Sequence, residues 1–553
     1  MSDDGLSYRF RDHPGSGANG NACSHVKSPA WLRITMALAI GIGILILPSN
    51  PADFSSLPLP PFPLEILGLV LAAVLLPCAA FRIFRPAATV ILALILFLKL
   101  ADIGTGLAFQ RPFNPYLDFK VIRDGWNLLS GSLGRFEAAA LTVAAFSIWL
   151  LVVASLFWSL RGFRTLSSSV SRILAAALSA CLAVGMVALT VSTAPPVSAD
   201  VAAYLANRVS LMHRSIADLS AFERELASDP LDSLSPPQHF SQLAEKDVIF
   251  IFVESYGRSA LENPSYASRI QARLQEMDRG ISSMGLEARS GWLTSPTVGG
   301  LSWLAHGALL SGLWTDNQAR YDRMIASRRL PVNALFRNAG WQTTAIMPAI
   351  TMDWPESAYF GYDTVRDATG LGYRGKPFNW VTMPDQYTLS AFERLDRPTG
   401  HRPVMAEIAL ISSHAPWTPV PTLVGWNSIG DGRVFNSQAD AGDPPSAVWS
   451  DPERIRIQYL ASIDYVLQTL SSYIARHGDD TLFVLLGDHQ PAAVVTGEGA
   501  SRDVPMHIIG PAALLDQISD WGWSNGMIPA AELPPLRMDL FREKFVRSFS
   551  DVG

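Results

Sequence analysis

Apolar residues are distributed very unevenly along this chain of 553 residues, and that asymmetry limits what the chain can fold into. Crossing the apolar core of a bilayer takes roughly 20 predominantly apolar residues in a helix. No stretch after Ala194 meets this requirement, whereas five earlier stretches do: Trp31–Leu47, Phe62–Phe81, Ala87–Phe109, Phe136–Leu160 and Ile173–Val191. The sequence therefore predicts a five-helix transmembrane domain over residues 31–194, followed by a large domain outside the bilayer.

The positions of Lys and Arg predict the orientation, because cytoplasmic loops retain positive charge. Basic residues precede the first stretch and fill the loops after the second and fourth, so all three groups belong on one side: Arg9, Arg11, Lys27 and Arg33, then Arg82 and Arg85, then Arg161, Arg164 and Arg172. Residues 1–30 are thus expected to be a cytoplasmic polar tail in a protein of the cell (inner) membrane. Everything after Ala194 is expected to be extracytoplasmic, and periplasmic in a Gram-negative cell. The alternative, a cleaved signal peptide, is disfavoured because no small-residue cleavage site precedes Pro48.

Cysteine usage and net charge exclude several classes of protein. Cys23, Cys78 and Cys181 all precede Ala194, so the exported half has neither a disulfide nor a thiolate metal site. A net charge of -6 gives no basic surface for nucleic acid.

Two ionisable residues, Lys99 and Asp102, lie inside the third apolar stretch, where charges are costly unless they are paired. Their spacing of three places them on one helix face. The favoured interpretation is a neutralised pair near the outer interface, with Lys99 reaching toward it. The alternative is a contact to a lipid headgroup.

Residues 195–246 are predicted to form an amphipathic connector, lying along the outer membrane face or against the exported domain. Apolar residues recur there at roughly helical spacing and the pattern ends at Pro236-Pro237; they are Leu205, Val209, Leu211, Met212, Ile216 and Leu219.

The exported domain, residues 247–553, alternates strand and helix patterns, which predicts an α/β fold with a mostly parallel central sheet flanked by helices. The expected strands are Val248–Val253, Thr343–Met347, Met405–Ile411, Leu482–Leu486 and Val504–Ile509, and the expected helices are Ser302–Leu310, Val332–Asn338 and Pro452–Arg476. A Gly/Asp/Ser-rich segment over 419–449 is too long for a simple connection, so it is either a mobile lip over a site or an insertion.

Three of these strands are followed by side chains that bind metals or phosphate. Glu254 follows the first, His414 the third, and Asp488 and His489 the fourth. Ligands of open α/β sheets bind at the carboxyl ends of the strands. With the oxygen of Ser302, Glu254, Asp488 and His489 make a four-ligand set for one divalent ion, Mn²⁺ first, with Zn²⁺ and Mg²⁺ as alternatives. His414 remains free to bind a phosphate oxygen or to protonate a leaving group.

The segment Ser295–Gly312 contains the candidate nucleophile. Gly299 and Gly300 permit a tight turn, after which a helix starting at Ser302 offers free N–H groups to an anion. Beside a divalent cation a serine hydroxyl loses its proton readily and becomes a nucleophile. From this segment alone, Ser302 is equally well explained as a helix cap, and Thr297 is a rival nucleophile.

These motifs resemble the lipoteichoic acid synthase and phosphoglycerol transferase branch of the sulfatase-like alkaline phosphatase superfamily. The similarity covers nearly the whole layout, with short motifs: Phe-Val-Glu254, Ser-Ser-His414, Phe360-Gly-Tyr-Asp363 and Gly-Asp488-His489. The resemblance implies that Glu254, Asp488 and His489 are metal ligands and that His414 meets the substrate. Sulfatase-like members carry Leu-Leu-Thr-Gly seven residues after the nucleophile, so Leu309-Leu-Ser-Gly312 assigns that role to Ser302.

The chain also departs from these relatives. Formylglycine sulfatases have x-Pro-Ser-Arg after the modified residue, whereas Ser302 is followed by Trp-Leu-Ala-His306. His306 occupies the Arg position, where it either holds the same anion or packs against Trp303. Lipoteichoic acid synthases carry Trp-Asn-Arg where this chain has Trp354-Pro-Glu356 at another spacing, which leaves Trp354 as a candidate substrate contact and the headgroup open. The disulfides usual in phosphoethanolamine transferases are missing.

The resulting hypothesis is a metal-dependent phosphotransferase with a phospho-serine intermediate on Ser302. It would move an alkylphosphate headgroup, phosphoglycerol or similar, from a membrane phospholipid to an extracytoplasmic glycan or glycolipid. Two alternatives stay open: a phosphodiester or sulfate ester hydrolase using the same site, and a non-catalytic sensor with this fold.

Overall fold

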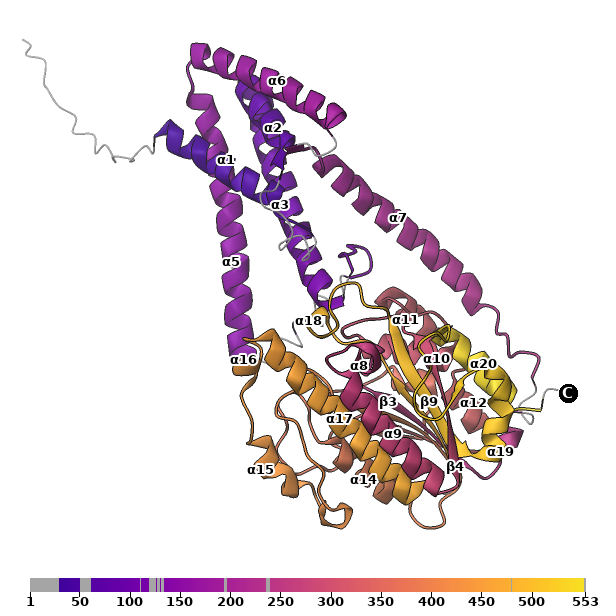
Figure 1. Ribbon diagram of the computed structural model, residues 1–553. Helices are drawn as coiled ribbons and strands as arrows, with labels where there is room; N and C mark the ends of the chain where they lie inside the picture. Colours follow the sequence, from indigo (N-terminus) through magenta and orange to yellow (C-terminus); the bar gives the residue numbers. More distant parts are fainter. Residues whose placement is uncertain are drawn as a thin grey trace, which may run out of the picture.

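The computed structural model describes residues 29–49, 61–109, 111–118, 126, 130, 134–192, 196–234, 239–478 and 480–551. A helical part lies before residue 192 and an α/β domain follows residue 239, with the long helix α7 (Val201–Leu226) between them (Figure 1). Cys23, Ala194, Pro236-Pro237, the basic residues of the predicted tail before residue 29 and the predicted outer-loop residues 50–60 lie outside the described residues.

Three helices of the described chain are long and apolar enough to cross a membrane, over Cys78–Leu107, Arg135–Thr165 and Ser168–Val191. The helices Ala30–Ile46 and Leu64–Leu75 are shorter, with 17 and 12 residues. At 1.5 Å per residue they are about 26 and 18 Å long, against an apolar bilayer core of roughly 30 Å. The helices of this part are α1 (Ala30–Ile46), α2 (Leu64–Leu75), α3 (Cys78–Phe109), α5 (Arg135–Ser159) and α6 (Ser168–Val191).

The structure therefore supports three membrane-crossing helices rather than the predicted five. The stretch Phe62–Phe81 is not a single helix, because α2 ends at Leu75 and α3 begins at Cys78. Leu76 between them has an extended backbone. It precedes Pro77, and a proline disfavours the helical conformation of the residue before it.

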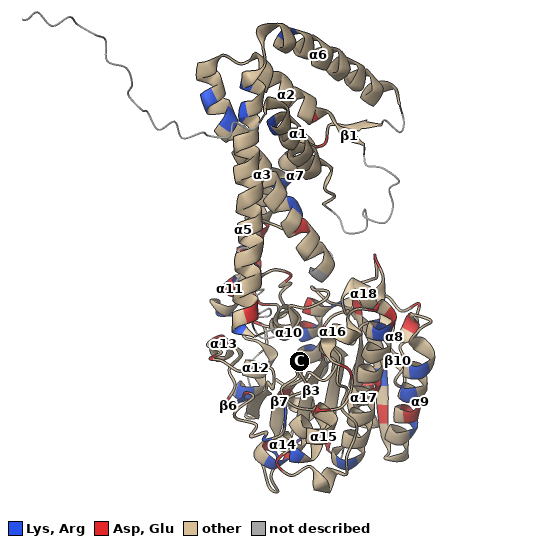
Figure 2. Cartoon of the chain, turned by 90° about the vertical axis from the view of Figure 1, so that its left-hand side faces the viewer, with Lys and Arg blue, Asp and Glu red and all other residues tan. Residues whose placement is uncertain are grey.

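Basic residues of the helical part gather at one end. The guanidinium of Arg33 lies 4.8 Å from the ring centroid of Trp158, and that of Arg85 lies 3.7 Å from the ring centroid of Phe157. Figure 2 shows Lys and Arg concentrated at the end of the helices remote from the α/β domain. The groups used to predict the cytoplasmic side thus lie together, while the orientation across a bilayer stays a prediction.

Lys99 and Asp102 each bond elsewhere, so the expected pair between them is wrong. Lys99 Nζ donates to the carbonyl oxygens of Leu45 and Leu47, 2.7 Å from each. These carbonyls end α1, where the helix dipole is negative and attracts a cation. Asp102 instead forms an ion pair with Arg208 of α7.

The predicted connector contains one continuous helix of 26 residues, α7, which contacts both parts of the protein. Near its start, Arg208 binds Asp102 of α3. Near its end, Asp218 accepts a hydrogen bond of 2.9 Å from Arg320 Nε in the α/β domain. Because a helix of this length is about 39 Å long, α7 acts as a stiff spacer between the two.

The α/β domain is built on a nine-stranded sheet with the order β10-β4-β9-β8-β3-β7-β5-β6, and β11 also pairs with β4. The strands from β8 to β6 are parallel, whereas β9 and β10 run antiparallel to their neighbours. The prediction of a mostly parallel sheet is confirmed. The strands are β3 (Asp247–Val253), β4 (Leu286–Thr294), β5 (Gln342–Ile346), β6 (Thr364–Arg366), β7 (Val404–Leu410), β8 (Thr481–Gly487), β9 (Asp503–Pro511), β10 (Ser524–Asn525) and β11 (Leu536–Arg537), and a separate pair joins β1 (Phe62–Pro63) to β2 (Val197–Ser198).

Helices cover both faces of the sheet. Alternate side chains of β3 point to opposite faces, and all of them are buried, so each face must be covered. Ile249 and Ile251 belong to the core that includes α9 and α17, whereas Phe250 and Phe252 belong to the core that includes α10, α12 and α20. The helices are α8 (Ser259–Glu262), α9 (Ala267–Ser283), α10 (Ser302–Ser311), α11 (Gln318–Ile325), α12 (Val332–Asn338), α13 (Ser357–Phe360), α14 (Asp385–Asp396), α15 (Asn436–Ala439), α16 (Pro445–Val448), α17 (Pro452–His477), α18 (Ala493–Thr496), α19 (Ala512–Leu515) and α20 (Phe541–Ser548).

The segment 419–449 is a packed insertion in this structure. It contains the short helices α15 and α16 and buries Phe435 and Val448 completely. The side chain of Gln386 bonds to the backbone of Val424 through both its amide nitrogen and its oxygen. Of the two interpretations left open, the insertion describes this segment better than the mobile lip.

Candidate active site

The central strands end in register, which brings their following residues to one edge of the sheet. Val253 of β3 is paired with Leu410 of β7 and with Gly487 of β8. The next residue on β3 is Glu254 and the next on β8 is Asp488. Two carboxylates from distant parts of the chain therefore lie side by side.

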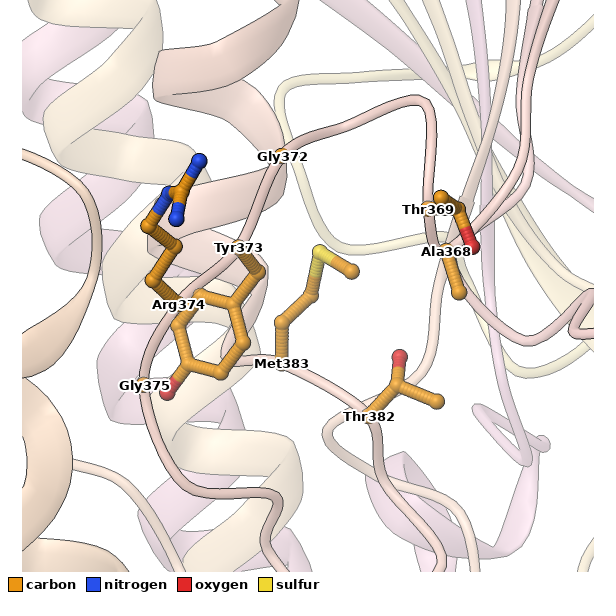
Figure 3. Close-up of a pocket in the computed structure, with 8 residues that line it drawn as sticks. All are labelled: Ala368, Thr369, Gly372, Tyr373, Arg374, Gly375, Thr382 and Met383. Atoms are coloured by element: carbon orange, nitrogen blue, oxygen red, sulfur yellow. The ribbon is translucent and has the colours of Figure 1, made fainter.

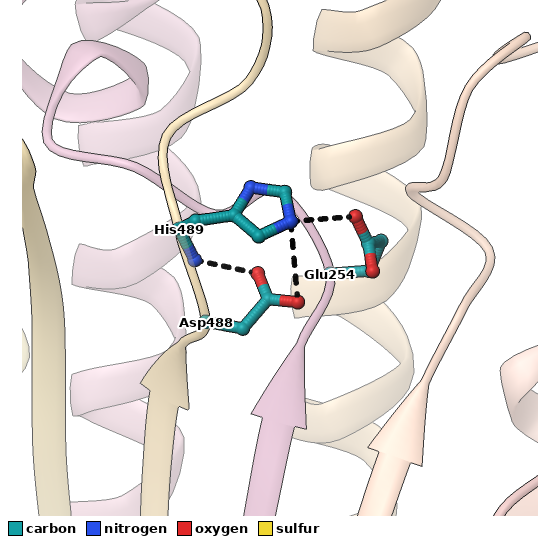
Figure 4. A group of neighbouring side chains, drawn as sticks. All are labelled: Glu254, Asp488 and His489. Carbon is teal, nitrogen blue, oxygen red and sulfur yellow. Dashed lines mark hydrogen bonds and ion pairs between the residues drawn. The ribbon is translucent and has the colours of Figure 1, made fainter. Parts of the chain in front are cut away.

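Glu254, Asp488 and His489 form a buried cluster (Figure 4), in which each offers one ligand atom and these atoms lie within 4.8 Å of one another. His489 Nε2 is 3.3 Å from Glu254 Oε1 and 3.7 Å from Asp488 Oδ2. His489 Nδ1 lies 2.8 Å from the carbonyl of Gln490, so it is the protonated nitrogen that donates there. Nε2 then faces the two carboxylates.

The hydroxyl of Ser302 completes this group. Ser302 Oγ lies 3.0 Å from Glu254 Oε2 and 3.1 Å from His489 Nε2. Ser302 is the first residue of α10, and the cap position is held by Leu301, which forms no side-chain cap. The helix-cap interpretation of Ser302 is therefore wrong, and its oxygen faces the cluster instead.

The loop before α10 is held in an uncommon conformation. Gly299, Gly300 and Leu301 have φ angles of 73°, 145° and 64°, a region that side chains with a Cβ rarely adopt. Gly299 N donates to the carbonyl of Gln490, next to His489. For Leu301, which has a Cβ, this conformation costs about 1–3 kcal/mol and persists because neighbouring structure enforces it. Here it aims the start of α10 at the cluster.

Thr297, the rival nucleophile, points elsewhere. Its hydroxyl donates to the carbonyl of Gly300 at 2.7 Å, and the residue is 5% exposed. Of the two hydroxyls, only that of Ser302 contacts Glu254 and His489.

The electrostatics of the cluster favour a bound cation. Burial and the neighbouring Glu254 carboxylate raise the pKa of Asp488 to about 7. Burial acts to lower the pKa of His489, but the carboxylates of Asp488 and Glu254 outweigh it and raise that pKa to about 9. The cluster therefore takes up positive charge as protons when no other cation neutralises it. Two carboxylates, one imidazole and a hydroxyl are donors that suit Mn²⁺, Zn²⁺ or Mg²⁺.

His306 takes part in a second buried polar group that the sequence did not predict. Its Nδ1 lies 2.7 Å from Oε1 of Glu407 on β7, and its ring stacks on Phe252 rather than on Trp303. Glu407 also accepts hydrogen bonds from Asn333 and from the hydroxyl of Tyr362. A charged residue within an otherwise apolar strand is the sequence signal that would have pointed to Glu407.

His414 is fixed in orientation at the end of β7. Its Nδ1 lies 2.5 Å from the carbonyl of Ala415, and its ring stacks on Trp380 with centroids 3.6 Å apart. Its charge lowers the pKa of Glu254, although burial of Glu254 and the charge of His489 are larger influences on that carboxyl. His414 therefore lies near the cluster with Nε2 unengaged by the Ala415 bond.

Trp354 lies in an aromatic group beside this region. Its ring centroid is 6.0 Å from that of Phe360 and 6.1 Å from that of Tyr362. Because Tyr362 bonds to Glu407, and Glu407 to His306, Trp354 is linked to the site through three contacts. The structure does not bring it into the Ser302 cluster.

A cavity of about 460 Å³ lies on the same domain (Figure 3). Its walls come from two segments, 368–375 and 382–383, and include Tyr373, Arg374 and Thr382. Thr382 is two residues from Trp380, whose ring covers His414.

Comparisons with known proteins agree with the fold of this domain. Residues 246–511 match the family described as Sulfatase, so this region is a sulfatase-family domain. No curated protein sequence matches the chain.

Several solved structures are distantly similar. The lipoteichoic acid synthase LtaP from Listeria monocytogenes is 14% identical, with a TM-score of 0.34; the match covers 48% of this chain and 65% of that one, less than two thirds of its length. The Streptococcus pyogenes phosphoglycerol transferase GacH in complex with sn-glycerol-1-phosphate is 11% identical over 62% of this chain and 97% of that one, with a TM-score of 0.35. The C-terminal periplasmic domain of EcEptC from Escherichia coli in complex with Zn is 12% identical over 48% and 72% of the two chains, with a TM-score of 0.32.

Proposed function

We propose that this chain is a membrane-anchored, metal-dependent transferase of alkylphosphate groups. It would move phosphoglycerol or a similar headgroup from a membrane phospholipid to an extracytoplasmic glycan or glycolipid. The observation that supports this most strongly is the position of the Ser302 hydroxyl, 3.0 Å from Glu254 and 3.1 Å from His489 at the start of α10. A hydroxyl at a helix N-terminus, beside two carboxylates and an imidazole, suits attack on an anionic phosphodiester.

Glu254, Ser302, Asp488 and His489 are the residues that would hold one divalent cation, Mn²⁺ first, with Zn²⁺ and Mg²⁺ as alternatives. When bound, such an ion lowers the pKa of a neighbouring hydroxyl and stabilises charge on phosphoryl oxygens. The geometry fits this role because Glu254, Asp488 and His489 each offer a ligand atom and these atoms lie within 4.8 Å of one another.

The residues of the chain then divide the reaction between them. Ser302 Oγ attacks the lipid phosphorus, and its proton passes to Glu254, which already accepts a hydrogen bond from that hydroxyl. The bond from phosphorus to the diacylglycerol oxygen breaks, and His414 Nε2 is the group that gives a proton to the leaving oxygen. An acceptor hydroxyl next loses its proton to His414 and attacks the phosphoserine; the bond from phosphorus to Ser302 Oγ breaks, and that oxygen takes back the proton held by Glu254.

His306 is placed to bind the phosphoryl anion. It lies one helical turn after Ser302 on α10, and Glu407 holds its Nδ1. Glu407 orients the imidazole, so the other ring nitrogen is left to contact the anion. His306 thus takes the place of the arginine of sulfatases. Membrane anchoring keeps such a site close to its lipid donor.

Mass spectrometry of the protein after incubation with isotope-labelled phospholipids tests this proposal. We expect a headgroup-phosphate adduct on the peptide that contains Ser302, absent from Ser302→Ala and retained in Thr297→Val, the neighbouring hydroxyl change. An adduct on Thr297 contradicts the proposal. The absence of any adduct from samples quenched during turnover also contradicts it. Product that forms equally fast without a sugar acceptor would instead favour a hydrolase with the same nucleophile.

A further inference from the structure

A second cavity lies in the helical part of the protein, away from the candidate active site. It encloses about 280 Å³ and is bordered by the end of α1, the starts of α2 and α7, and the middle of α3. Its lining carries both signs of charge: Lys99, Glu65 and Asp200. A charged cavity between apolar helices is unusual, because ionisable groups there are costly unless they serve a partner.

Lys99 contributes a buried ammonium to this cavity. The residue is 8% exposed, and its Nζ donates to the carbonyls of Leu45 and Leu47. An ammonium has three N–H donors, so one donor remains after these two bonds. That donor is available to an anionic oxygen inside the cavity.

Glu65 contributes a carboxylate that is only half satisfied. Its Oε1 accepts a hydrogen bond of 2.8 Å from the backbone N–H of Val201, the first residue of α7. Its Oε2 is buried and has no hydrogen-bond partner among the described residues. Leaving a buried acceptor unpaired costs about 1–3 kcal/mol, and more when the group is charged. A ligand that donates to this carboxylate would remove that cost.

We propose that this cavity binds the headgroup of a phospholipid that bears a protonated primary amine. The lipid phosphate accepts from the remaining Lys99 donor, and the ammonium donates to Glu65, with Asp200 at the exposed edge adding a second negative charge. Two carboxylates against one ammonium leave the wall net negative, which favours a zwitterionic headgroup over a purely anionic one. The volume is at the small end of ligand pockets, in keeping with a headgroup rather than a whole lipid.

This site lies in the helical part, so binding there is separable from the proposed transfer reaction. Ser302→Ala removes the proposed nucleophile and leaves every residue of the cavity intact. If the Ser302→Ala protein keeps the preference for the amine-bearing lipid, lipid binding in this cavity does not depend on the proposed transfer reaction.

Native mass spectrometry of the full chain in detergent provides the test, with phosphatidylethanolamine, phosphatidylcholine and phosphatidylglycerol of identical acyl chains as probes. We expect phosphatidylethanolamine to bind about tenfold more tightly than the other two, the effect of roughly one good charge-assisted hydrogen bond. Phosphatidylcholine carries the same charge without an N–H donor, so it separates donation from charge alone. Equal binding of the three lipids, or preference for phosphatidylglycerol, overturns the proposal.

Variants connect the preference to the cavity. Glu65→Gln retains an oxygen for Val201 but loses the charge, and we expect it to abolish the preference. Asp200→Asn, at an exposed position, should reduce it by a few-fold without affecting folding. The matched control is Glu137→Gln, an exposed glutamate in the first turn of α5, which should bind as the unaltered protein does. Identical behaviour of Glu65→Gln and Glu137→Gln contradicts the proposal.

Discussion

His306 Nδ1 lies 2.7 Å from Glu407 Oε1, which joins α10 to the central strand β7 across 101 residues of sequence. The imidazole is further fixed by Phe252, whose ring stacks on it with centroids 3.7 Å apart. Glu407 is 1% exposed and has no solvent to neutralise it. The pair is therefore a preorganised unit one turn from Ser302, in which Glu407 positions the ring that we propose binds the phosphoryl anion.

Glu407→Gln and His306→Gln should each lower kcat by up to about 10²-fold, the lower end of what a positioned acid or cation contributes. Because the two act as one unit, the double variant should lose little more than either single variant. Steady-state kinetics of the two single variants and the double variant checks this. The matched control is Glu287→Gln, an exposed glutamate on β4. Additive losses in the double variant would contradict a shared role.

The buried strands were predictable because parallel strands covered on both faces consist of consecutive apolar residues. The run Val248–Val253 agrees with β3 within one residue, since only Asp247 extends it. β4 was missed because it alternates exposed Glu287 and half-buried Arg289 with buried residues, as an antiparallel strand near a sheet edge does. α9 was missed although Ile270, Leu274 and Ile281 recur at helical spacing, so that error lay in reading the pattern.

The site was only partly predictable for a different reason. Glu254, Asp488 and His489 follow apolar runs, and strand alignment brings them together without further information. The partner of His306 depends on which face of β7 meets α10, which spacing alone does not give. The stretch Phe62–Phe81 was predicted as one helix because its apolar length was counted across Pro77, where the chain leaves the helix.

Removal of divalent metal should abolish turnover and lower the thermal stability of the α/β domain. A ligand that binds only the folded state at 100 times its Kd stabilises it by about 2.7 kcal/mol. Differential scanning fluorimetry with chelator, followed by addition of Mn²⁺, Zn²⁺ or Mg²⁺, measures the shift. Asp488→Asn should lose most of the shift, because it removes one of two carboxylates from the cluster.

Ser302→Ala provides the control for the metal experiment. It removes the nucleophile but keeps Glu254, Asp488 and His489, so most of the metal-induced stabilisation should remain while turnover is lost. If Ser302→Ala and Asp488→Asn lose the same stabilisation, the assignment of the three remaining residues as the main ligands is wrong.

His507 should make the domain less stable in acid. Burial lowers the pKa of this residue to about 3, and its ring lies between the hydroxyls of Tyr256 and Ser290. The unfolded chain binds a proton below about pH 6.5 whereas the folded one does not, so stability falls as pH drops from about 6.5 to about 3, by roughly 1.4 kcal/mol per unit. Urea unfolding at several pH values should show this slope reduced in His507→Gln. An unchanged slope would place the acid sensitivity elsewhere.

A glycine is required at position 487 because β8 approaches the backbone of Tyr256 closely there. A Cβ at this position would lie 1.8 Å from the carbonyl oxygen of Tyr256, which belongs to the backbone and cannot rotate away. Gly487→Ala should therefore destabilise the domain by about 1–3 kcal/mol or more, as overpacked cores do, and move Asp488 out of the cluster. Gly280 in α9 has open space around its Cβ position, so Gly280→Ala should instead stabilise by about 0.5–1 kcal/mol. Thermal unfolding of both variants checks the opposite signs, and metal titration of Gly487→Ala should show weakened binding, because the geometry of the cluster depends on where β8 ends.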